Sequence, residues 1–137
     1  MIRVLIDTNV LLDLLLAREP FATDARAIWI ACEEGRCIGF VAAISVTTIW
    51  YIGRKQIGLS AARQHIAHIL TTLRVAPVDA SVLNVAQASS IVDFEDAVQA
   101  SSAAALGIEM IVTRNGGDFA GTSLKVLTPA QFLHYLT

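Results

Sequence analysis

The stretch from Ile2 to Asn9 has the sequence Ile-Arg-Val-Leu-Ile-Asp-Thr-Asn, an apolar and β-branched run that stops at a carboxylate, Asp7. Such a run is typical of a central strand in a parallel sheet, because helices cover both faces of that kind of sheet. Open parallel sheets bind ligands in the crevice outside the carboxyl ends of their strands. We therefore expect Asp7 to lie at a binding crevice. The alternative is that Asp7, Thr8 and Asn9 only cap the following helix.

The composition predicts one globular domain spanning residues 1–137. Of the 137 residues, 55% are hydrophobic, which is enough to bury one core. Charged residues interrupt every apolar stretch before it reaches the roughly 18 residues that a membrane span requires. The first residues also lack the basic and apolar regions of a signal peptide. We therefore expect a cytoplasmic protein that does not bind membranes.

Charge is unevenly distributed along the chain. The net charge is −2, which argues against a generically basic nucleic-acid binder. Residues 1–74 contain eight Lys or Arg and six Asp or Glu, whereas residues 75–137 contain two and six. Three of the last six acids are Asp93, Glu95 and Asp96. This local concentration favours a cation site, although acids at the start of a helix are an alternative explanation.

Apolar periodicity and turn residues predict alternating strands and helices. Strands are expected at residues 2–7, 38–41, 75–78, 110–113 and 124–127, and Pro77 limits the third to an edge or an extended link. Helices are expected over residues 10–16, 20–35, 44–54 and 60–73, after Asp79, after Asp93, and after Thr128-Pro129. This alternation predicts an α/β fold, a three-layer α/β/α sandwich with a mostly parallel central sheet.

Three aspartates lie where a strand ends or a helix begins. Asp7 follows the first strand, Asp96 falls on the first turn of a helix, and Asp118 follows the fourth strand. If they converge, their charges repel one another unless a cation neutralises them. Oxygen ligands suit Mg²⁺ or Mn²⁺, which can activate water and stabilise a phosphodiester displacement. Separated aspartates also occur in domains that bind no metal, so the spacing alone is not specific.

Three blocks of sequence resemble the signature blocks of the PIN domain family. They are Val-Leu-Ile-Asp-Thr-Asn at residues 4–9, Asp-Phe-Glu-Asp-Ala at residues 93–97, and Ile-Val-Thr-Arg-Asn at residues 111–115 followed by Asp-Phe at residues 118–119. The last block resembles that of the bacterial toxins of toxin–antitoxin pairs. PIN domains are Mg²⁺- or Mn²⁺-dependent ribonucleases with a compact α/β/α fold. The resemblance implies that the catalytic metal ligands are Asp7, Asp96 and Asp118.

The sequence departs from the family pattern at one position. The family usually has a glutamate in the helix after the second strand, and alignment of residues 42–51 places Thr48 there. A hydroxyl can hydrogen-bond a metal-bound water but cannot supply the charge of a carboxylate. Glu95 could compensate, although adjacent side chains on a helix point about 100° apart. We therefore expect metal or RNA binding to be retained better than turnover.

Other side chains are expected to support the site or to contact RNA. The resemblance implies that water or phosphate is positioned with the help of Thr8, Asn9, Thr113 and Asn115. Arg54, Lys55 and Arg114 are candidates for contacts with RNA phosphates, which supply most sequence-independent affinity. For Arg54 and Lys55 the alternative is a favourable interaction with the C-terminal end of a helix dipole.

The resemblance implies a metal-dependent endoribonuclease that acts on RNA, and its last block implies the toxin of a toxin–antitoxin pair with an antitoxin protein as partner. The abundance of apolar residues suggests a homodimer. The alternative is a non-catalytic PIN-fold module that binds RNA or protein. Haloacid-dehalogenase-type phosphatases and phosphoacceptor receivers also place an aspartate after the first strand. The former require a second aspartate where this chain has Asn9. The latter require an acidic pair and a late lysine, and we can place neither in this sequence.

Overall fold

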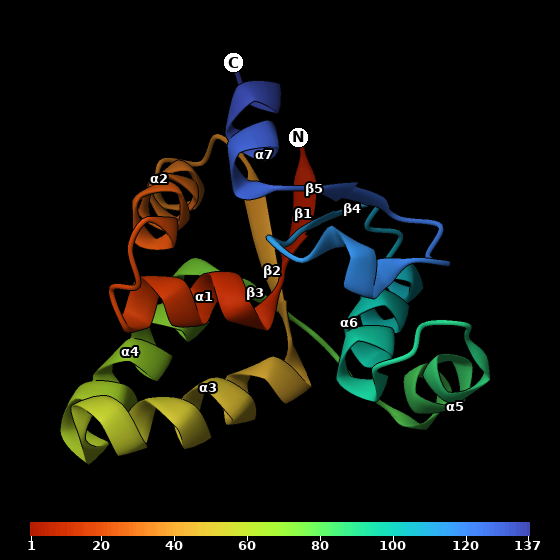
Figure 1. Cartoon of the computed structure of the whole chain (residues 1–137), viewed down its shortest axis with the longest axis horizontal. Helices are drawn as coiled ribbons and strands as arrows, with labels where there is room; N and C mark the ends of the chain where they lie inside the picture. Colours follow the sequence, from red (N-terminus) through yellow and green to blue (C-terminus); the bar gives the residue numbers. More distant parts are fainter.

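The structure, a computed structural model, describes all residues from Met1 to Thr137 (Figure 1). The strands are β1 (Arg3–Ile6), β2 (Ile38–Ala42), β3 (Arg74–Ala76), β4 (Met110–Val112) and β5 (Lys125–Leu127). The helices are α1 (Thr8–Leu15), α2 (Phe21–Glu33), α3 (Ala43–Ile57), α4 (Leu59–Thr72), α5 (Ala80–Ala88), α6 (Phe94–Ala105), the 3-10 helix η1 (Gly116–Phe119) and α7 (Pro129–Tyr135). The predicted α/β fold is confirmed, and each predicted strand and helix is present with its ends shifted by a few residues.

The strands form one parallel sheet in the order β3-β2-β1-β4-β5. β1 is central, because Val4 pairs with Gly39 of β2 on one side and with Met110 of β4 on the other. The sheet is thus wholly parallel rather than mostly so. The chain builds outward from β1 in one direction and then crosses to the other side, which places the topological switch point between β1 and β4. β3 lies at an edge, as the following Pro77 predicts.

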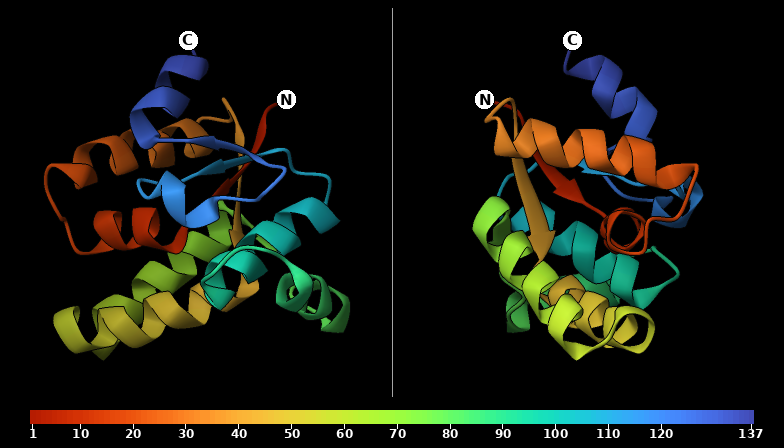
Figure 2. Two further views of the ribbon diagram at one scale, coloured as in Figure 1. Left: turned by 45° about the vertical axis from the view of Figure 1, so that its right-hand side comes forward. Right: turned by 90° about the vertical axis from the view of Figure 1, so that its left-hand side faces the viewer.

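Helices cover both faces of the sheet, as the views in Figures 1 and 2 show. Side chains of β1 alternate between the two faces: Val4 and Ile6 belong to one buried cluster and Leu5 to the other. The first cluster contains residues of α1, α2, α3, α4 and α7, and the second contains residues of α5, α6 and η1. Burial on both faces explains why β1 is continuously apolar. None of the helices combines the length and the apolar character needed to span a bilayer.

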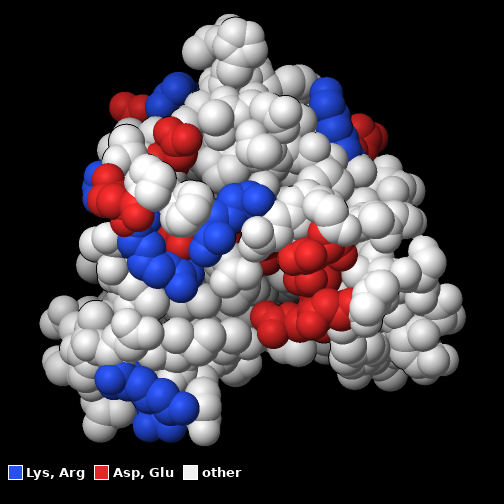
Figure 3. Space-filling model, viewed as in Figure 1, with Lys and Arg blue, Asp and Glu red and all other residues white.

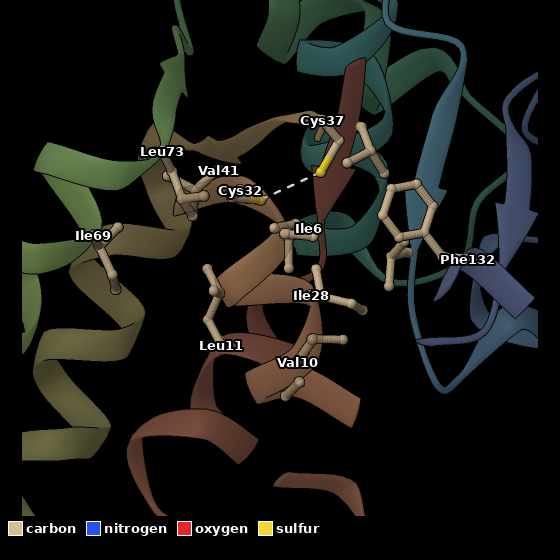
Figure 4. Packing of buried hydrophobic residues seen from close by; sticks show 14 of the residues in the cluster. Ile6, Val10, Leu11, Ile28, Cys32, Cys37, Val41, Ile69, Leu73 and Phe132 are labelled. Atoms are coloured by element: carbon tan, nitrogen blue, oxygen red, sulfur yellow. Dashed lines mark hydrogen bonds between the residues drawn. The ribbon is translucent and has the colours of Figure 1, made fainter. Parts of the chain in front are cut away.

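Gly39 of β2 lies where helices pack closest to the sheet. A Cβ atom at this position would be 2.7 Å from both Cys32 Sγ and Leu73 Cδ2. Cys32 Sγ is in turn 3.7 Å from Cys37 Sγ, and both thiols are buried (Figure 4). Protein cores are closely packed, so a side chain at this position would push the end of α2 and the segment after α4 away from the strand. Glycine lets both of them approach the strand closely.

Local capping sets the starts of three helices. Asp79 and Asp93 each accept a hydrogen bond at 3.0 Å from the backbone N–H three residues later, as predicted. Thr128 forms a reciprocal capping box with Gln131, and Pro129 occupies the first helical position. These side chains satisfy N–H groups that the helix itself leaves free. The cap at Asp93 fixes the first turn of α6, which carries Asp96.

Candidate active site

An acidic cleft opens at the carboxyl end of β1, beside the switch point of the sheet. Its volume is about 290 Å³, and it is lined by Asp7, Thr8, Asn9, Leu12, Thr48, Ile52, Asp93, Glu95, Asp96, Gln99 and Asp118. Figure 3 shows the Asp and Glu atoms of this region gathered in one patch, with Lys and Arg atoms outside it. The three aspartates of the sequence prediction therefore line a common cleft, although they come from three distant segments.

Asp7 forms the floor of the cleft and is only 2% exposed. Its Oδ1 accepts a hydrogen bond from Gln99 Nε2 at 2.9 Å, and its Oδ2 accepts one from Thr113 Oγ1 at 2.9 Å. Asp7 is the N-cap residue of α1, but its side chain makes no capping hydrogen bond to that helix, and the nearby N–H groups of Thr8 and Asn9 have only a minor effect in lowering its pKa. Burial raises the pKa of Asp7, and the hydrogen bonds from Gln99 and Thr113 oppose that rise. The carboxylate is thus held in one orientation by two neighbouring elements.

Asp96 faces Asp7 from the first turn of α6 and carries the strongest electrostatic strain in the cleft. Its pKa is raised from 3.8 to about 7, first by desolvation and then by the charges of Asp7, Asp93, Asp118 and Glu95. A carboxyl group that titrates near neutrality because other carboxylates surround it is common at functional sites. The helix start alone would favour a charged Asp96, so the repulsion within the cleft outweighs the helix dipole here.

Glu95 also faces the cleft, despite being adjacent to Asp96 on the helix. Thr8 Oγ1 lies 3.2 Å from Glu95 Oε1 and 2.7 Å from Ser45 Oγ. A hydroxyl has one proton, so Thr8 satisfies both contacts by donating to Glu95 and accepting from Ser45. The pKa of Glu95 is raised, chiefly by burial. Thr48, in the position of the usual family glutamate, lines the same cleft, and its hydroxyl lies 3.3 Å from the Ile44 carbonyl oxygen.

Gln99 was not identified from the sequence, yet it connects the parts of the site. Its side chain is 1% exposed. The amide nitrogen donates to Asp7 and lies 3.5 Å from Asp96 Oδ1, while its Oε1 accepts the N–H of Thr8 at 3.2 Å. A sequence signal was present: Gln99 is three residues after Asp96, so the two side chains share a helix face. Ser45, the partner of Thr8, was also missed.

The segment after β4 brings Asp118 to the rim of the cleft. Asp118 lies in η1, and its N–H donates to the carbonyl of Asn115 at 3.0 Å. The N–H of Asn115 donates to Thr113 Oγ1 at 3.0 Å. Thr113 lies beneath the floor against Asp7, and Asn115 is not among the residues that line the cleft. Thr113 therefore links the orientation of Asp7 to the turn that carries Asp118.

The three basic candidates lie outside the cleft lining. Arg114 contacts Asp13 through Nε at 2.8 Å, and its guanidinium lies 4.2 Å from the centre of the Phe21 ring. The positive charge of Arg114 thus compensates the carboxylate of Asp13, a residue that is 1% exposed. Arg54 and Lys55 are on the last turn of α3, each 4.6 Å from the centre of the Tyr51 ring.

The donor chemistry of the cleft fits a divalent cation. Mg²⁺ and Mn²⁺ prefer oxygen ligands, and a carboxylate that already accepts one hydrogen bond per oxygen keeps free lone pairs. No three acidic, histidine or cysteine side chains of the chain are grouped, as they lie, so as to hold one ion. The pKa of Asp96 is raised first by burial and then by repulsion from the neighbouring carboxylates, and a bound cation would relieve that repulsion. The acidic residues of the cleft therefore fit a divalent cation, both by their negative charge and because they offer oxygen ligands.

Comparisons with known proteins agree with this architecture. A PIN domain family model matches residues 3–116, and the chain therefore belongs to the PIN domain family. A search of curated proteins found no significant match.

Solved structures with a similar fold include toxins of several bacteria. VapC20 of Mycobacterium tuberculosis, a sarcin–ricin loop cleaving toxin, is 19% identical with a TM-score of 0.69, over 87% of this chain and 95% of that one. A toxin–antitoxin complex from Klebsiella pneumoniae is 24% identical with a TM-score of 0.68, over 92% and 97%. FitAcB from Neisseria gonorrhoeae is 17% identical with a TM-score of 0.69, over 93% and 98%. At these identities the likeness establishes the fold.

Proposed function

We propose that the protein is a metal-dependent endoribonuclease that hydrolyses RNA phosphodiester bonds and acts as the toxin of a toxin–antitoxin pair. The observation that carries the proposal is the gathering of Asp7, Asp96 and Asp118 in one cleft beside the sheet switch point. Family membership supports it, since PIN domains are ribonucleases. The similar folds of VapC20 and of the Klebsiella toxin–antitoxin complex also support it.

In the proposed mechanism, Asp7, Asp96 and Asp118 hold Mg²⁺ or Mn²⁺. When bound, such a cation supplies an activated water and stabilises the charge that develops on the phosphate. Asp7 is the fixed ligand, because Gln99 and Thr113 hold both of its oxygens. Asp96 and Asp118 are more exposed and are free to adjust their side chains toward the ion.

Glu95 is the best candidate to replace the glutamate that is absent at Thr48. Both residues line the cleft, and the Thr48 hydroxyl is one of the groups that stabilise the charged form of Glu95. In this role Glu95 accepts a proton from the attacking water or orients it, while Thr8 holds the carboxylate in place. The hydroxyls of Thr8 and Thr48 and the amide of Asn9 give the cleft neutral hydrogen-bonding groups, which a phosphate tolerates better than further carboxylates.

RNA would leave the cleft along α3. Lys55 follows Thr48 by seven residues, which places it on the same helix face about 10 Å further along. It is exposed, so it can reach a phosphate one or two nucleotides away from the cut. Arg54 is the second candidate on this turn. Arg114 acts mainly on the fold through Asp13, and a direct RNA contact by Arg114 remains a prediction.

Partner binding follows from the same proposal. An antitoxin would have to neutralise the acidic cleft or block its entrance, and exposed apolar side chains offer contact area for it or for a second copy. The large apolar side chains that are at least half exposed outside the cleft region include Tyr51, Leu59, Leu70 and Val85. Co-purification with the product of a neighbouring gene tests the antitoxin, and light scattering tests the dimer.

RNA cleavage by purified protein tests the function directly. We expect cleavage of single-stranded RNA that requires Mg²⁺ or Mn²⁺, stops with EDTA, and is lost in the Asp96→Asn variant while the thermal melt remains cooperative. Cleavage by that variant at the wild-type rate would contradict the assigned roles.

A non-catalytic binding module is the second candidate, and Thr48 in the glutamate position favours it. Cleavage that appears only in a Thr48→Glu variant, from an inert parent, would support the second candidate.

A further inference from the structure

A second cavity opens directly beside the acidic cleft. Its volume is about 210 Å³, and it is lined by Val92, Asp93, Gly117, Asp118 and Ala120. Asp93 and Asp118 line both cavities. A polymer bound in the cleft therefore has room for one of its attached groups in the second cavity, next to the two aspartates that line both cavities.

The two chain segments that border this cavity are packed against each other. Gly121 has a φ of +96°, and a Cβ atom there would clash with the Ser90 side-chain oxygen. The loop before α6 and the segment after η1 are therefore in direct contact. At Gly117, by contrast, a Cβ atom would meet no atom within 4 Å. The cavity is open to solvent, since all five residues that line it are exposed, and a side chain added at Gly117 would extend from its lining without meeting another atom within 4 Å.

The lining is suited to a nucleobase and unsuited to a phosphate. Val92 and Ala120 offer apolar surface, which a base can cover with its face. Two carboxylates repel a phosphate but accept hydrogen bonds from N–H groups on the edge of a base. Asp93 uses Oδ1 to cap α6 at 3.0 Å, and its Oδ2 accepts no hydrogen bond within the chain. The volume is below the about 300 Å³ at which sites for drug-sized ligands begin, so a single base fits better than a whole nucleotide.

We propose that this cavity is a nucleobase subsite that takes the base adjoining the scissile phosphate and selects a base with an exocyclic amino group. Adenine, cytosine and guanine have such a group to donate to Asp93. Uracil has only a ring N–H that lies between two carbonyl oxygens, and the two carboxylates repel those oxygens. The inference rests on the proposed ribonuclease function and adds its substrate specificity. Asp118 lines both cavities and is a proposed metal ligand, so it lies between the subsite and the reacting phosphate.

The first test adds bulk to the lining of the cavity and identifies the bases at the cut. Wild type, Gly117→Val and the control Gly116→Ala are incubated with Mn²⁺ and a pool of randomised single-stranded RNA, and the ends of the products are sequenced. The control lies in the same turn, and its Cβ would be 3.4 Å from Val126, an ordinary contact outside the cavity. We expect wild type and the control to disfavour uracil at one position about tenfold or more, the effect of one hydrogen bond to a charged group. Gly117→Val should lose this preference.

The second test changes the hydrogen-bonding groups of Asp93 and adds no bulk to the cavity. Asparagine caps helices as well as aspartate does, so Asp93→Asn keeps the start of α6. Its side chain can also donate to a carbonyl oxygen of uracil. We expect the cleavage preference to move toward uracil by about tenfold. The ratio between bases is the readout because it does not depend on the overall rate, which loss of a charge near Asp96 will alter.

Thermal melts with and without Mn²⁺ confirm that each variant is folded and still binds the ion. RNA cleavage by wild type with no base preference would overturn the subsite and leave the ribonuclease function intact. An unchanged preference in both Gly117→Val and Asp93→Asn would do the same. A wild type that cleaves no RNA under any metal condition would overturn the proposed function and the subsite with it.

Discussion

Replacement of Asp96 by asparagine should stabilise the metal-free protein, because it removes one charge from a cleft in which carboxylates repel one another. The pKa of Asp96 is raised from 3.8 to about 7. For a group shielded from water, a rise of this size would correspond to about 4 kcal/mol. Asp96 is partly exposed, and solvent screening reduces the effect, so we expect about 1 to 2 kcal/mol at pH 8.

The sign of the pH dependence follows from the direction of the shift. A raised pKa means that the native state binds more protons than the unfolded state between about pH 4 and pH 7. The stability of the wild type therefore falls as pH rises through this range, and Asp96→Asn should remove part of that fall. The two proteins should have similar stability near pH 4 and differ most at pH 8.

Thermal melts in EDTA followed by circular dichroism measure this difference. For a domain of this size, 1 to 2 kcal/mol corresponds to a rise in Tm of roughly 3 to 10 °C. Asp24→Asn is the matched control, since Asp24 is also an acidic residue of a first helical turn but lies outside the cleft. An ion at a hundred times its Kd adds about 2.7 kcal/mol, so Mn²⁺ should raise the Tm of wild type and have a smaller effect on Asp96→Asn.

The reasoning would be refuted if Asp96→Asn were less stable than wild type by the same amount at pH 4 and pH 8. That result would mean that Asp96 matters as part of the helix start and not through its charge in the cleft. A difference in Tm between Asp24→Asn and wild type that grows with pH in the same way would also remove the special role of the cleft.

Three further predictions concern the frame around the site. Gln99→Ala should cost about 2 to 4 kcal/mol in urea unfolding, because it leaves the Thr8 N–H and one Asp7 oxygen without their partner; an unchanged midpoint would mean that water takes over both contacts. Arg114→Met should cost about 1 to 3 kcal/mol, because the buried Asp13 then keeps only the contact with Arg18 at 2.8 Å; loss of RNA affinity at unchanged stability would instead favour a phosphate contact. Gly39→Ala should cost about 1 to 3 kcal/mol by overpacking against Cys32 and Leu73. A Cys32→Ala change in the same chain should recover part of that cost, and no recovery would place the strain elsewhere.

The parts of the fold that local sequence determines could be predicted. Asp79, Asp93 and Thr128 cap helices within three residues of their own positions, so each carries its signal nearby. The continuous apolar run of β1 predicts a strand buried on both faces. The convergence of Asp7 and Asp118 was predictable because the parallel strands that precede them end at one edge of the sheet, whereas Asp96 reaches the same edge from the start of α6.

The contacts between distant segments could not be predicted in the same way. Gln99 is polar in the middle of a helix, and nothing near it in sequence indicates that its amide meets Asp7, 92 residues away. The contact between Arg114 and Asp13 joins residues that are 101 positions apart, so it could not be predicted either. The cavity beside Asp93 depends on Gly121 packing against Ser90, and a pair of small residues gives no pattern in a single sequence.

The central place of β1 has a consequence for synthesis of the protein on the ribosome. Val4 and Leu5 are made more than 100 residues before β4, which begins at Met110 and is one of their two neighbouring strands. The sheet cannot close around β1, and Asp7 cannot meet Asp96 or Asp118, until most of the chain has emerged. Pairings that span so much sequence also form late during folding, because long loops must close first. A nascent chain that stops before Asp118 therefore lacks the assembled cleft, and the proposed activity can appear only after the segment from Met110 to Asp118 has been made.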